Sequence, residues 1–387
     1  MKKSFKGLLL LIIIIFTGCS SKTEKLKLIS NDIEANEENY TAKITATGDI
    51  MYHPWTFRDV KDSDGNYDFS HFYQEMQDEI IKSDLMIGNF ETTSTPSRKM
   101  SGFPMFNTPE KAIEDLKKSG FDILTTANNH CIDSGKVGIE DTIDAFDKNG
   151  IKHTGTWKKG ENKKYLIEEV NNIKIGFLAY TESFNGVEGN LKQDEKSMIS
   201  PLNEEEIKKD IETLKDKKAD FIVIFPHWGV EYSTKPNDFQ KELGHKMLDW
   251  GADVILGSHP HVIQPIEKVE KDGKEKYIIY SMGNSISGQR ERYSKNSNTE
   301  AGVFVNLNIE KKSSENEAVI KNIEISPTWV KEEKNEGKKI LEVVPMNEYL
   351  ESGKLRSTVS SDNLNRILNI RKNSIDILES MGYETGL

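Results

Sequence analysis

Residues of the types that bind metal ions occur at five points of this sequence, each shortly after an apolar run. They are two carboxylates, one carboxamide and four imidazoles: Asp49, Glu91, Asn129, His130, His227, His259 and His261. Four of the eight histidines of the chain are therefore in this set. Carboxylate, amide oxygen and imidazole together suit borderline divalent metals such as Mn, Zn or Fe. We expect a metal-binding site built from these side chains.

The apolar runs before these residues are typical of buried strands and lie at residues 44–46, 85–87, 121–124, 221–225 and 254–256. The segments between them have apolar residues at helical spacing, and several end at a glycine such as Gly120 or Gly251. Strands alternating with helices predict an α/β fold. Ligand sites of open α/β sheets lie beyond the carboxyl ends of the strands, so these residues are expected to converge at one edge.

Each motif has a simpler explanation when it is taken alone. Gly-Asp after a strand is a common turn, and Asn128-Asn129-His130 suits a turn followed by a cap. The His259-Pro260-His261 pair has fewer structural uses, and the joint occurrence of all the motifs favours a metal site. We assign His71, His153 and His245 to the surface or the core. The sequence leaves the roles of His53 and Cys131 open.

Beyond about residue 262 the pattern changes. Segments 277–280, 302–309 and 318–325 look like successive strands joined by charged turns. They predict a second, more antiparallel sheet packed against the first. Residues 362–381 carry apolar side chains at helical spacing and predict a C-terminal helix that serves packing.

Seven motifs, in this order, resemble those of the CapA family of capsule (poly-γ-glutamate) biosynthesis proteins, in the calcineurin-like metallophosphatase superfamily. They begin at Gly48-Asp49, Asn89-Phe90-Glu91, Ala127-Asn128-Asn129-His130, His227-Trp228-Gly229, Gly251-Ala252-Asp253, His259-Pro260-His261 and Tyr280-Ser281-Met282-Gly283-Asn284. The resemblance covers about residues 43–285. It implies a metallophosphatase-like α/β fold, a four-layer αββα sandwich of two mixed sheets, to which the C-terminal helix is added.

The resemblance also implies roles for individual residues. The metal ligands would be Asp49, Glu91, Asn129, His227, His259 and His261. Asn129 and His130 would act in catalysis, with His130 facing the substrate as an acid or charge stabiliser. The substrate-binding residues would be Asn284, Trp228 and Glu231. Mn, Zn and Fe remain equal candidates for the metal.

Two departures from the phosphatase pattern bear on this prediction. Met51 stands where that pattern has a histidine, and Gly88-Asn89-Phe90-Glu91 lacks the usual bridging aspartate, so that Glu91 takes its place further along. One metal site would then be incomplete unless His53 fills the gap. The sequence therefore predicts a variant metal site and leaves open whether the protein is an enzyme.

The N-terminus predicts export and lipid anchoring. Residues 1–18 have a basic start and a short apolar run, which is typical of a secretory signal peptide. Thr17-Gly18-Cys19 resembles the lipobox of bacterial lipoproteins, in which Cys19 would receive a diacylglyceryl anchor. An uncleaved N-terminal anchor is the alternative, and both place the rest of the chain outside the cytoplasmic membrane. We expect a polar tether at residues 19–40, the metallophosphatase-like domain at 41–345 and a helical extension at 346–387.

Composition narrows the choice of partners. The formal net charge of −11 disfavours nucleic-acid binding, and it would repel an anionic polymer unless a metal or a local basic patch compensates. Two cysteines exclude a disulfide framework. The leading hypothesis is an extracellular accessory of membrane capsule synthase subunits that acts on an anionic polymer. The alternatives are an active metal-dependent phosphoesterase or γ-glutamyl amide hydrolase acting on cell-surface substrates, and a binding lipoprotein that has lost the metal.

Overall fold

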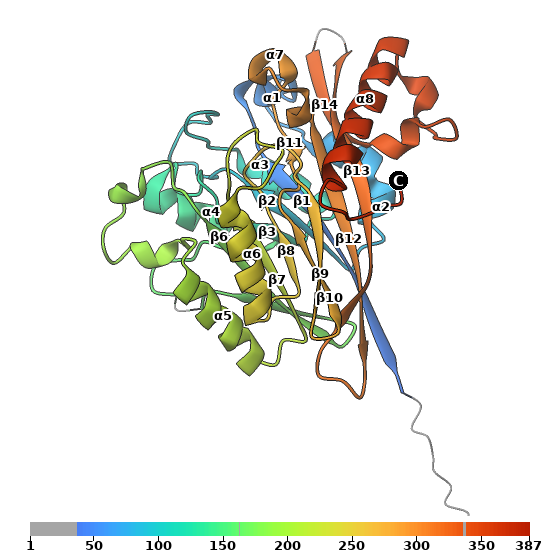
Figure 1. Ribbon diagram of the computed structural model, residues 1–387. Coiled ribbons are helices and arrows are strands. Elements are labelled where there is room, and N and C mark those ends of the chain that lie inside the picture. The colour runs from blue at the N-terminus through green and yellow to red at the C-terminus, as the bar shows by residue number, and fades with distance from the viewer. Residues whose placement is uncertain (1–36, 162, 336–337) are drawn as a thin grey trace, which may run out of the picture. The chain divides into compact units, whose positions relative to one another are not determined.

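Two β-sheets pack face to face in the computed structural model, which describes residues 37–161, 163–335 and 338–387 (Figure 1). The predicted signal peptide and most of the predicted tether, including Cys19, lie outside the described residues. Apolar side chains of both sheets meet in one central core, which includes Ile44 and Ile87 from the first sheet and Phe177 and Val223 from the second. The described chain enters the fold at Asn39, where the first strand begins.

The first sheet has the strand order β14-β13-β12-β1-β2-β3-β4, and β11 also pairs with β1. Its parallel strands are β1 (Asn39–Ile50), β2 (Leu85–Phe90), β3 (Ile123–Thr125), β4 (Lys152–Thr154) and the short β11 (Asn284–Ile286). Its antiparallel strands are β12 (Ala301–Lys312), β13 (Val319–Asn335) and β14 (Lys338–Pro345). The sheet is therefore mixed, as we predicted.

The second sheet has the strand order β5-β6-β7-β8-β10-β9. Its parallel centre is formed by β6 (Ile173–Thr181), β7 (Phe221–His227), β8 (Val254–Leu256) and β10 (Lys274–Ile279). Antiparallel strands form both edges, namely β5 (Leu166–Val170) and β9 (Ile266–Lys271). This sheet is also mixed.

Helices cover the outer face of each sheet. On the first sheet a core of apolar side chains joins the strands to η1 (Ser70–Met76), α2 (Gln77–Ile80), α3 (Glu110–Lys118) and α4 (Gly135–Asn149). On the second sheet α5 (Glu204–Asp216) and α6 (Asp238–Trp250) bury residues such as Ile211 and Met247. The order helix, sheet, sheet, helix confirms the predicted αββα sandwich.

Local capping explains where the two helices of the second sheet begin. The side chain of Asn203 accepts hydrogen bonds from the backbone N–H groups of Glu205 and Glu206 and so caps α5. Asn237 and Gln240 form a reciprocal capping box at the start of α6. Gly251 ends α6 with a φ of 121°, a conformation that favours glycine. These signals are visible in the sequence, and they place α6 directly after the loop that leaves β7.

The prediction for the strands after residue 262 was wrong in one respect. They do not form the second sheet by themselves: β9 and β10 extend the sheet of β6–β8, whereas β12–β14 join β1 in the first sheet. The alternation of apolar residues identifies a strand but not its neighbour. The chain changes sheets after β10, when β11 pairs with β1.

The C-terminal helix α8 (Ser361–Leu378) confirms the prediction for this segment. Its apolar residues Ile367, Ile370 and Leu378 join the central core together with Trp329 and Val344 of β13 and β14, and Figure 1 shows α8 beside β13. The remaining helical turns are α1 (Pro54–Asp59), α7 (Glu291–Ser294), η2 (Glu188–Asn190), η3 (Lys196–Met198), η4 (Ser297–Glu300), η5 (Met346–Tyr349) and η6 (Arg356–Thr358). Within the described residues, no helix is both long and apolar enough to span a bilayer.

Candidate metal centre

The carboxyl ends of strands from both sheets meet at the predicted ligand residues. Asp49 is the penultimate residue of β1, Glu91 follows β2, and Asn129 lies in the loop after β3. From the second sheet, His227 ends β7, and the loop after β8 supplies the remaining ligands, His259 and His261. The predicted convergence is therefore confirmed, with each sheet contributing part of the site.

Asp49, Glu91 and His261 form one group of close ligand atoms. Nδ1 of His261 lies 3.1 Å from Oδ2 of Asp49, and its Nε2 lies 3.7 Å from Oε1 of Glu91. All three side chains are buried. An ion can bind only one ring nitrogen of His261, and one ligand atom from each of these three residues lies within 4.8 Å of the others.

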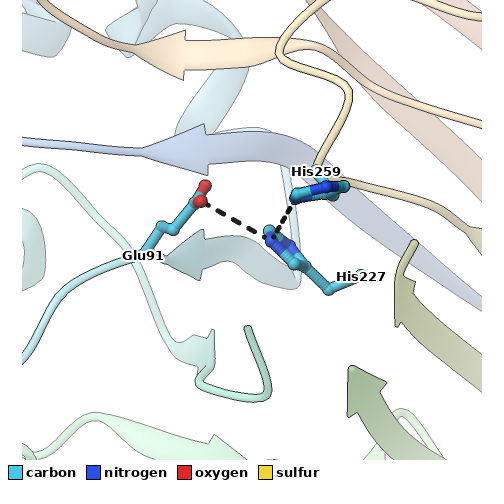
Figure 2. Close-up of side chains that lie close together, drawn as sticks. All are labelled: Glu91, His227 and His259. Atoms are coloured by element: carbon cyan, nitrogen blue, oxygen red, sulfur yellow. Dashed lines mark hydrogen bonds and ion pairs between the residues drawn. The ribbon is translucent and has the colours of Figure 1, made fainter. Parts of the chain in front are cut away.

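Glu91, His227 and His259 form the second group (Figure 2). Nε2 of His227 lies 3.5 Å from Oε1 of Glu91 and 3.1 Å from Nδ1 of His259. The same Nε2 lies 3.0 Å from Oδ1 of Asn129, which adds an amide oxygen to this group. Glu91 belongs to both groups, and its carboxylate therefore lies where a ligand shared by two ions would lie.

The burial and hydrogen bonding of the Glu91 carboxylate indicate that these residues fit a metal ion. Both carboxylate oxygens are buried, and neither makes a hydrogen bond to any described residue. A buried carboxylate that makes no hydrogen bond is unfavourable, and a bound cation offsets that cost. The surrounding donors are oxygen and imidazole nitrogen, which suit a borderline divalent ion.

Asp49 and His261 form an ion pair in the metal-free protein. Burial alone would raise the pKa of Asp49, but the hydrogen bond and charge of His261 lower it to about 2. Burial alone would lower the pKa of His261, but the carboxylates of Glu91 and Asp49 raise it to about 9. At neutral pH the metal-free pair is therefore a carboxylate with an imidazolium, and His261 must lose a proton before it can bind a metal.

Burial also shifts the pKa values of the second group. Burial, together with the negative charge of Asp49, raises the pKa of Glu91 well above its ordinary value. Burial lowers the pKa of His227 to about 3, and burial with the nearby histidines lowers that of His259 well below its usual range. Both imidazoles are thus available as neutral ligands at physiological pH.

Unusual backbone conformations place the ligands. His259 and His261 have φ values of 99° and 56°, a region that non-glycine residues rarely adopt and that is frequent at functional sites. Gly48 allows the β1 and β11 segments to approach each other, because a Cβ at this position would lie 1.8 Å from the carbonyl oxygen of Gly283. The backbone N–H of Asp49 donates to that same oxygen, at 3.0 Å.

His130 lies beside the ligand groups, in contact with an acid. Its Nδ1 donates to Oδ2 of Asp133 at 2.8 Å, and both side chains are buried. The backbone N–H of His130 donates to Oδ1 of Asn128, whose amide in turn donates to the carbonyl of Phe90 at the end of β2. The Asp133 contact leaves Nε2 of His130 as the ring atom that is free to meet a ligand.

The predicted substrate-binding residues lie in different surroundings. Glu231 is exposed, and its charge acts on Glu91 and His261, so it lies at the rim of the centre. Asn284 is buried, its amide donates to the carbonyl of His261 at 3.2 Å, and its Oδ1 has no hydrogen-bond partner among the described residues. Asn284 is thus placed to orient the His261 loop.

Trp228 does not fit the substrate-binding prediction. Its side chain is fully buried in the core beneath α6, and its indole N–H donates to the carbonyl of Tyr280 at 3.0 Å. This position leaves no surface for a substrate, so we correct its role to packing. The sequence pattern could not distinguish these roles, because it places Trp228 directly after a ligand residue.

Several supporting residues were missed in the sequence. Asn185 lies in the loop after β6, and its Nδ2 donates to the carbonyl of Asn129 while its Oδ1 accepts from Nδ2 of Asn129. This pairing turns Oδ1 of Asn129 towards His227. Asn89 donates to Oδ1 of Asp49 at 2.8 Å, and Ser258 contacts Nδ1 of His227 at 2.9 Å. Asn185 follows a strand end, as the ligands do, and that signal could have found it.

The two residues left open also have defined positions. His53 is partly buried, and its Nδ1 accepts a hydrogen bond from the backbone N–H of Gly288 at 3.1 Å. Burial, with the nearby charges of His261 and His130, lowers its pKa to about 3. Cys131 is buried, and burial raises its pKa to about 12, so this thiol is a packing residue.

Two mixed sheets between helical layers, with a carboxylate, amide and histidine cluster at their shared carboxyl edge, define a four-layer αββα domain with a candidate metal centre. The chain belongs to the family described as bacterial capsule synthesis protein PGA_cap, whose model matches residues 43–289. It is 31% identical over 290 residues to the capsule biosynthesis protein CapA of Bacillus anthracis, covering 73% of this chain and 67% of the relative. It is 28% identical over 307 residues to the PGA biosynthesis protein CapA of Bacillus subtilis (strain 168), covering 74% of each chain.

Among solved structures, the calcineurin-like phosphoesterase YfkN from Bacillus subtilis is similar to this chain, with a TM-score of 0.47 and 16% identity. That similarity covers 87% of this chain and 98% of the other.

Proposed function

We propose that this protein acts outside the cell in the synthesis or export of an anionic capsule polymer such as poly-γ-glutamate, and that a divalent metal centre binds the polymer. Family membership supports the link to capsule synthesis. The observation that carries the metal centre is Glu91, a buried carboxylate that makes no hydrogen bond within the described residues and lies close to both His227 and His261. Asp49, Asn129 and His259 complete the ligand set.

A bound metal ion would offset the repulsion between this negatively charged chain and an anionic polymer. A protein with a formal net charge of −11 repels a polyanion. A bound divalent ion supplies positive charge and Lewis acidity at the centre. The side chains that would bind the ion are positioned by contacts within the chain. Asp49 and His261 contact each other, and Asn185 orients Asn129. Carboxylates of the polymer would be bound at this point.

The N-terminal sequence supports the proposed location. The pattern at residues 1–19 supports export and attachment of a lipid at Cys19. The centre would act on the growing polymer outside the cell, beside membrane capsule synthase subunits.

The test is binding of a γ-linked glutamate oligomer to the full chain in detergent, with and without Mn²⁺. We expect binding that requires Mn²⁺ and that is lost in the His259→Ala variant. Equal binding without metal, or in that variant, would contradict the proposal. For the anchor, Cys19→Ala should release the protein from the membrane fraction of the cells that express it.

A second candidate function is metal-dependent hydrolysis of a phosphoester or γ-glutamyl amide. The observation that favours it is the 2.8 Å contact between His130 and Asp133, which leaves Nε2 of His130 free to hold a proton for a leaving group. Turnover of bis-p-nitrophenyl phosphate or of a γ-glutamyl amide with Mn²⁺ distinguishes the two functions. Equal rates for the wild type and His130→Asn would contradict hydrolysis by this centre.

A further inference from the structure

His53 lies in the loop between β1 and α1 and offers a polar atom that the metal centre does not use. Its Nδ1 is 3.1 Å from the backbone nitrogen of Gly288, and a backbone N–H can only donate, so Nδ1 must accept. A neutral imidazole has one donor and one acceptor nitrogen. Nε2 of His53 therefore carries the hydrogen and has no lone pair for a metal.

The position of the ring next to the centre is fixed on several sides. His53 meets the edge of the Phe106 ring, with the ring centroids 5.3 Å apart, and Phe106 meets His130 in the same way at 4.7 Å. Phe106 is fully buried, so its ring is fixed and restricts the movement of both imidazole rings. On the other side, a Cβ on Gly288 would lie only 2.6 Å from Cβ of His53, which shows how closely the backbone packs against this residue.

Nε2 of His53 donates to no group in the described part of the chain. The ring is partly exposed, and the charges of His261 and His130 act on it. A fixed, unused N–H donor beside a centre of metal ligands is suited to an anionic oxygen of a bound molecule. The same geometry rules out the suggestion that His53 replaces the histidine missing at Met51.

We propose that His53 is a substrate-binding residue whose Nε2–H donates a hydrogen bond to an anionic oxygen, carboxylate or phosphate, of the molecule bound at the metal centre. Gly288 sets the tautomer and Phe106 sets the direction of the ring. This inference rests on the proposed function, because it requires an anionic ligand at that centre. It assigns His53 to the ligand and not to the metal.

Two substitutions separate the functions of the two ring nitrogens. In His53→Asn the amide oxygen can still accept from Gly288, but no donor remains at the position of Nε2. In His53→Gln the amide nitrogen replaces the Nε2 donor. Each full-length variant, in detergent, would be titrated with Mn²⁺ and then, in the Mn²⁺-loaded state, with inorganic phosphate or with γ-glutamyl-glutamate. Circular dichroism and the melting temperature report folding.

We expect His53→Asn to weaken binding of at least one probe by roughly tenfold or more, which is the usual effect of losing a hydrogen bond to a charged group. Mn²⁺ affinity should stay unchanged, and His53→Gln should retain most of the probe affinity. A larger loss for phosphate than for γ-glutamyl-glutamate would assign the donor to a phosphoryl group, and the reverse would assign it to a carboxylate.

Other results of these titrations would overturn the inference. Wild-type probe affinity in His53→Asn, or equal losses in both variants, would overturn this inference and leave the proposed function intact. Loss of Mn²⁺ binding in His53→Asn would make the residue a metal ligand and would also overturn it. Absence of probe binding by the Mn²⁺-loaded wild type would overturn the proposed function and this inference together.

Discussion

Oε1 of Glu91 and Nε2 of His227 lie 3.5 Å apart, although Glu91 follows a strand of the first sheet and His227 ends a strand of the second. The candidate centre therefore exists only where the two sheets are packed together. The packing depends on the central core, in which residues such as Ile87 and Phe225 from the two sheets are buried. A ligand that binds at this junction should stabilise the whole fold, because the unfolded chain cannot present the same set of atoms.

The first prediction concerns Glu91. Excess Mn²⁺ should raise the melting temperature of the wild type, because binding at about 100 times Kd stabilises the folded state by about 2.7 kcal/mol. Glu91→Gln should fold, since Gln has a similar shape and replaces a buried acid whose oxygens make no hydrogen bond within the described residues. This variant should show no increase with Mn²⁺ in differential scanning calorimetry.

Glu212→Gln is the matched control for Glu91→Gln, because Glu212 is an exposed acid of α5 that belongs to neither ligand group. Its Mn²⁺-dependent increase in melting temperature should equal that of the wild type. An undiminished increase in Glu91→Gln would mean that the ion binds elsewhere.

The second prediction is a pH dependence. The pKa of His261 is raised to about 9, so it carries a proton in the metal-free protein at neutral pH. Metal binding must displace this proton, so affinity should rise as pH rises from about 6.5 towards 9. Calorimetric titration with Mn²⁺ in buffers of different ionisation enthalpy measures the protons released. An affinity that is constant over this range would show that His261 is not a ligand.

The third prediction concerns Asn185, whose amide pairs with the carbonyl and the side chain of Asn129. Asn185→Ala should let the Asn129 amide rotate and should lower Mn²⁺ affinity by roughly tenfold, the lower end of the effects seen for residues that orient metal ligands. Asn190→Ala changes an exposed residue of the same loop and should have no effect in the same titration. Equal affinities for the two variants would remove Asn185 from the centre.

Much of the fold could be predicted because its signals are local. The run 221–225 and the glycine at 251 mark a strand and a helix end that the structure confirms. Strand neighbours are set by contacts between distant segments, which is why β12 was assigned to the wrong sheet. The pairing of β12 with β1 depends on the chain crossing between the sheets after β10, and no residue pattern of β12 itself reports that crossing.

The ligand set could be predicted for a similar reason. Asp49, His227 and the His259–His261 pair stand at strand ends, and parallel strands bring such ends together. Trp228 was misassigned because adjacent residues at a strand end point in opposite directions. His53 could not be resolved, since the hydrogen bond that determines its tautomer comes from Gly288, far along the chain.

The fourth prediction tests the second candidate function through Asp133. Asp133→Asn removes the anion that holds Nδ1–H of His130 and so allows the other tautomer. If His130 acts as a general acid, kcat for a phosphodiester or γ-glutamyl amide should fall by about 100-fold or more, with Mn²⁺ affinity unchanged. A loss of Mn²⁺ affinity in place of kcat would assign Asp133 to the structure of the metal centre.

The fifth prediction concerns a buried ion pair that links the C-terminal helix to the first sheet. Glu300 is 2% exposed and lies 2.9 Å from Arg290 and 3.0 Å from Arg366 of α8. Glu300→Gln leaves the buried guanidinium of Arg290 without its counter-charge and should lower the free energy of unfolding by about 3–5 kcal/mol in urea titrations. Asp376→Asn, which breaks an exposed pair with Lys372, should leave the unfolding midpoint unchanged. Similar midpoints for both variants would contradict the importance of the buried pair.

The most direct test of the metal centre is the metal content of the full chain after gel filtration, measured by elemental analysis on the wild type and on His259→Ala. The ligand geometry around Glu91 predicts near-stoichiometric divalent metal in wild type prepared with Mn²⁺, Zn²⁺ or Fe²⁺, and a large loss in the variant. A wild-type protein that retains none of these metals, or a variant that retains as much as the wild type, would contradict the proposed centre.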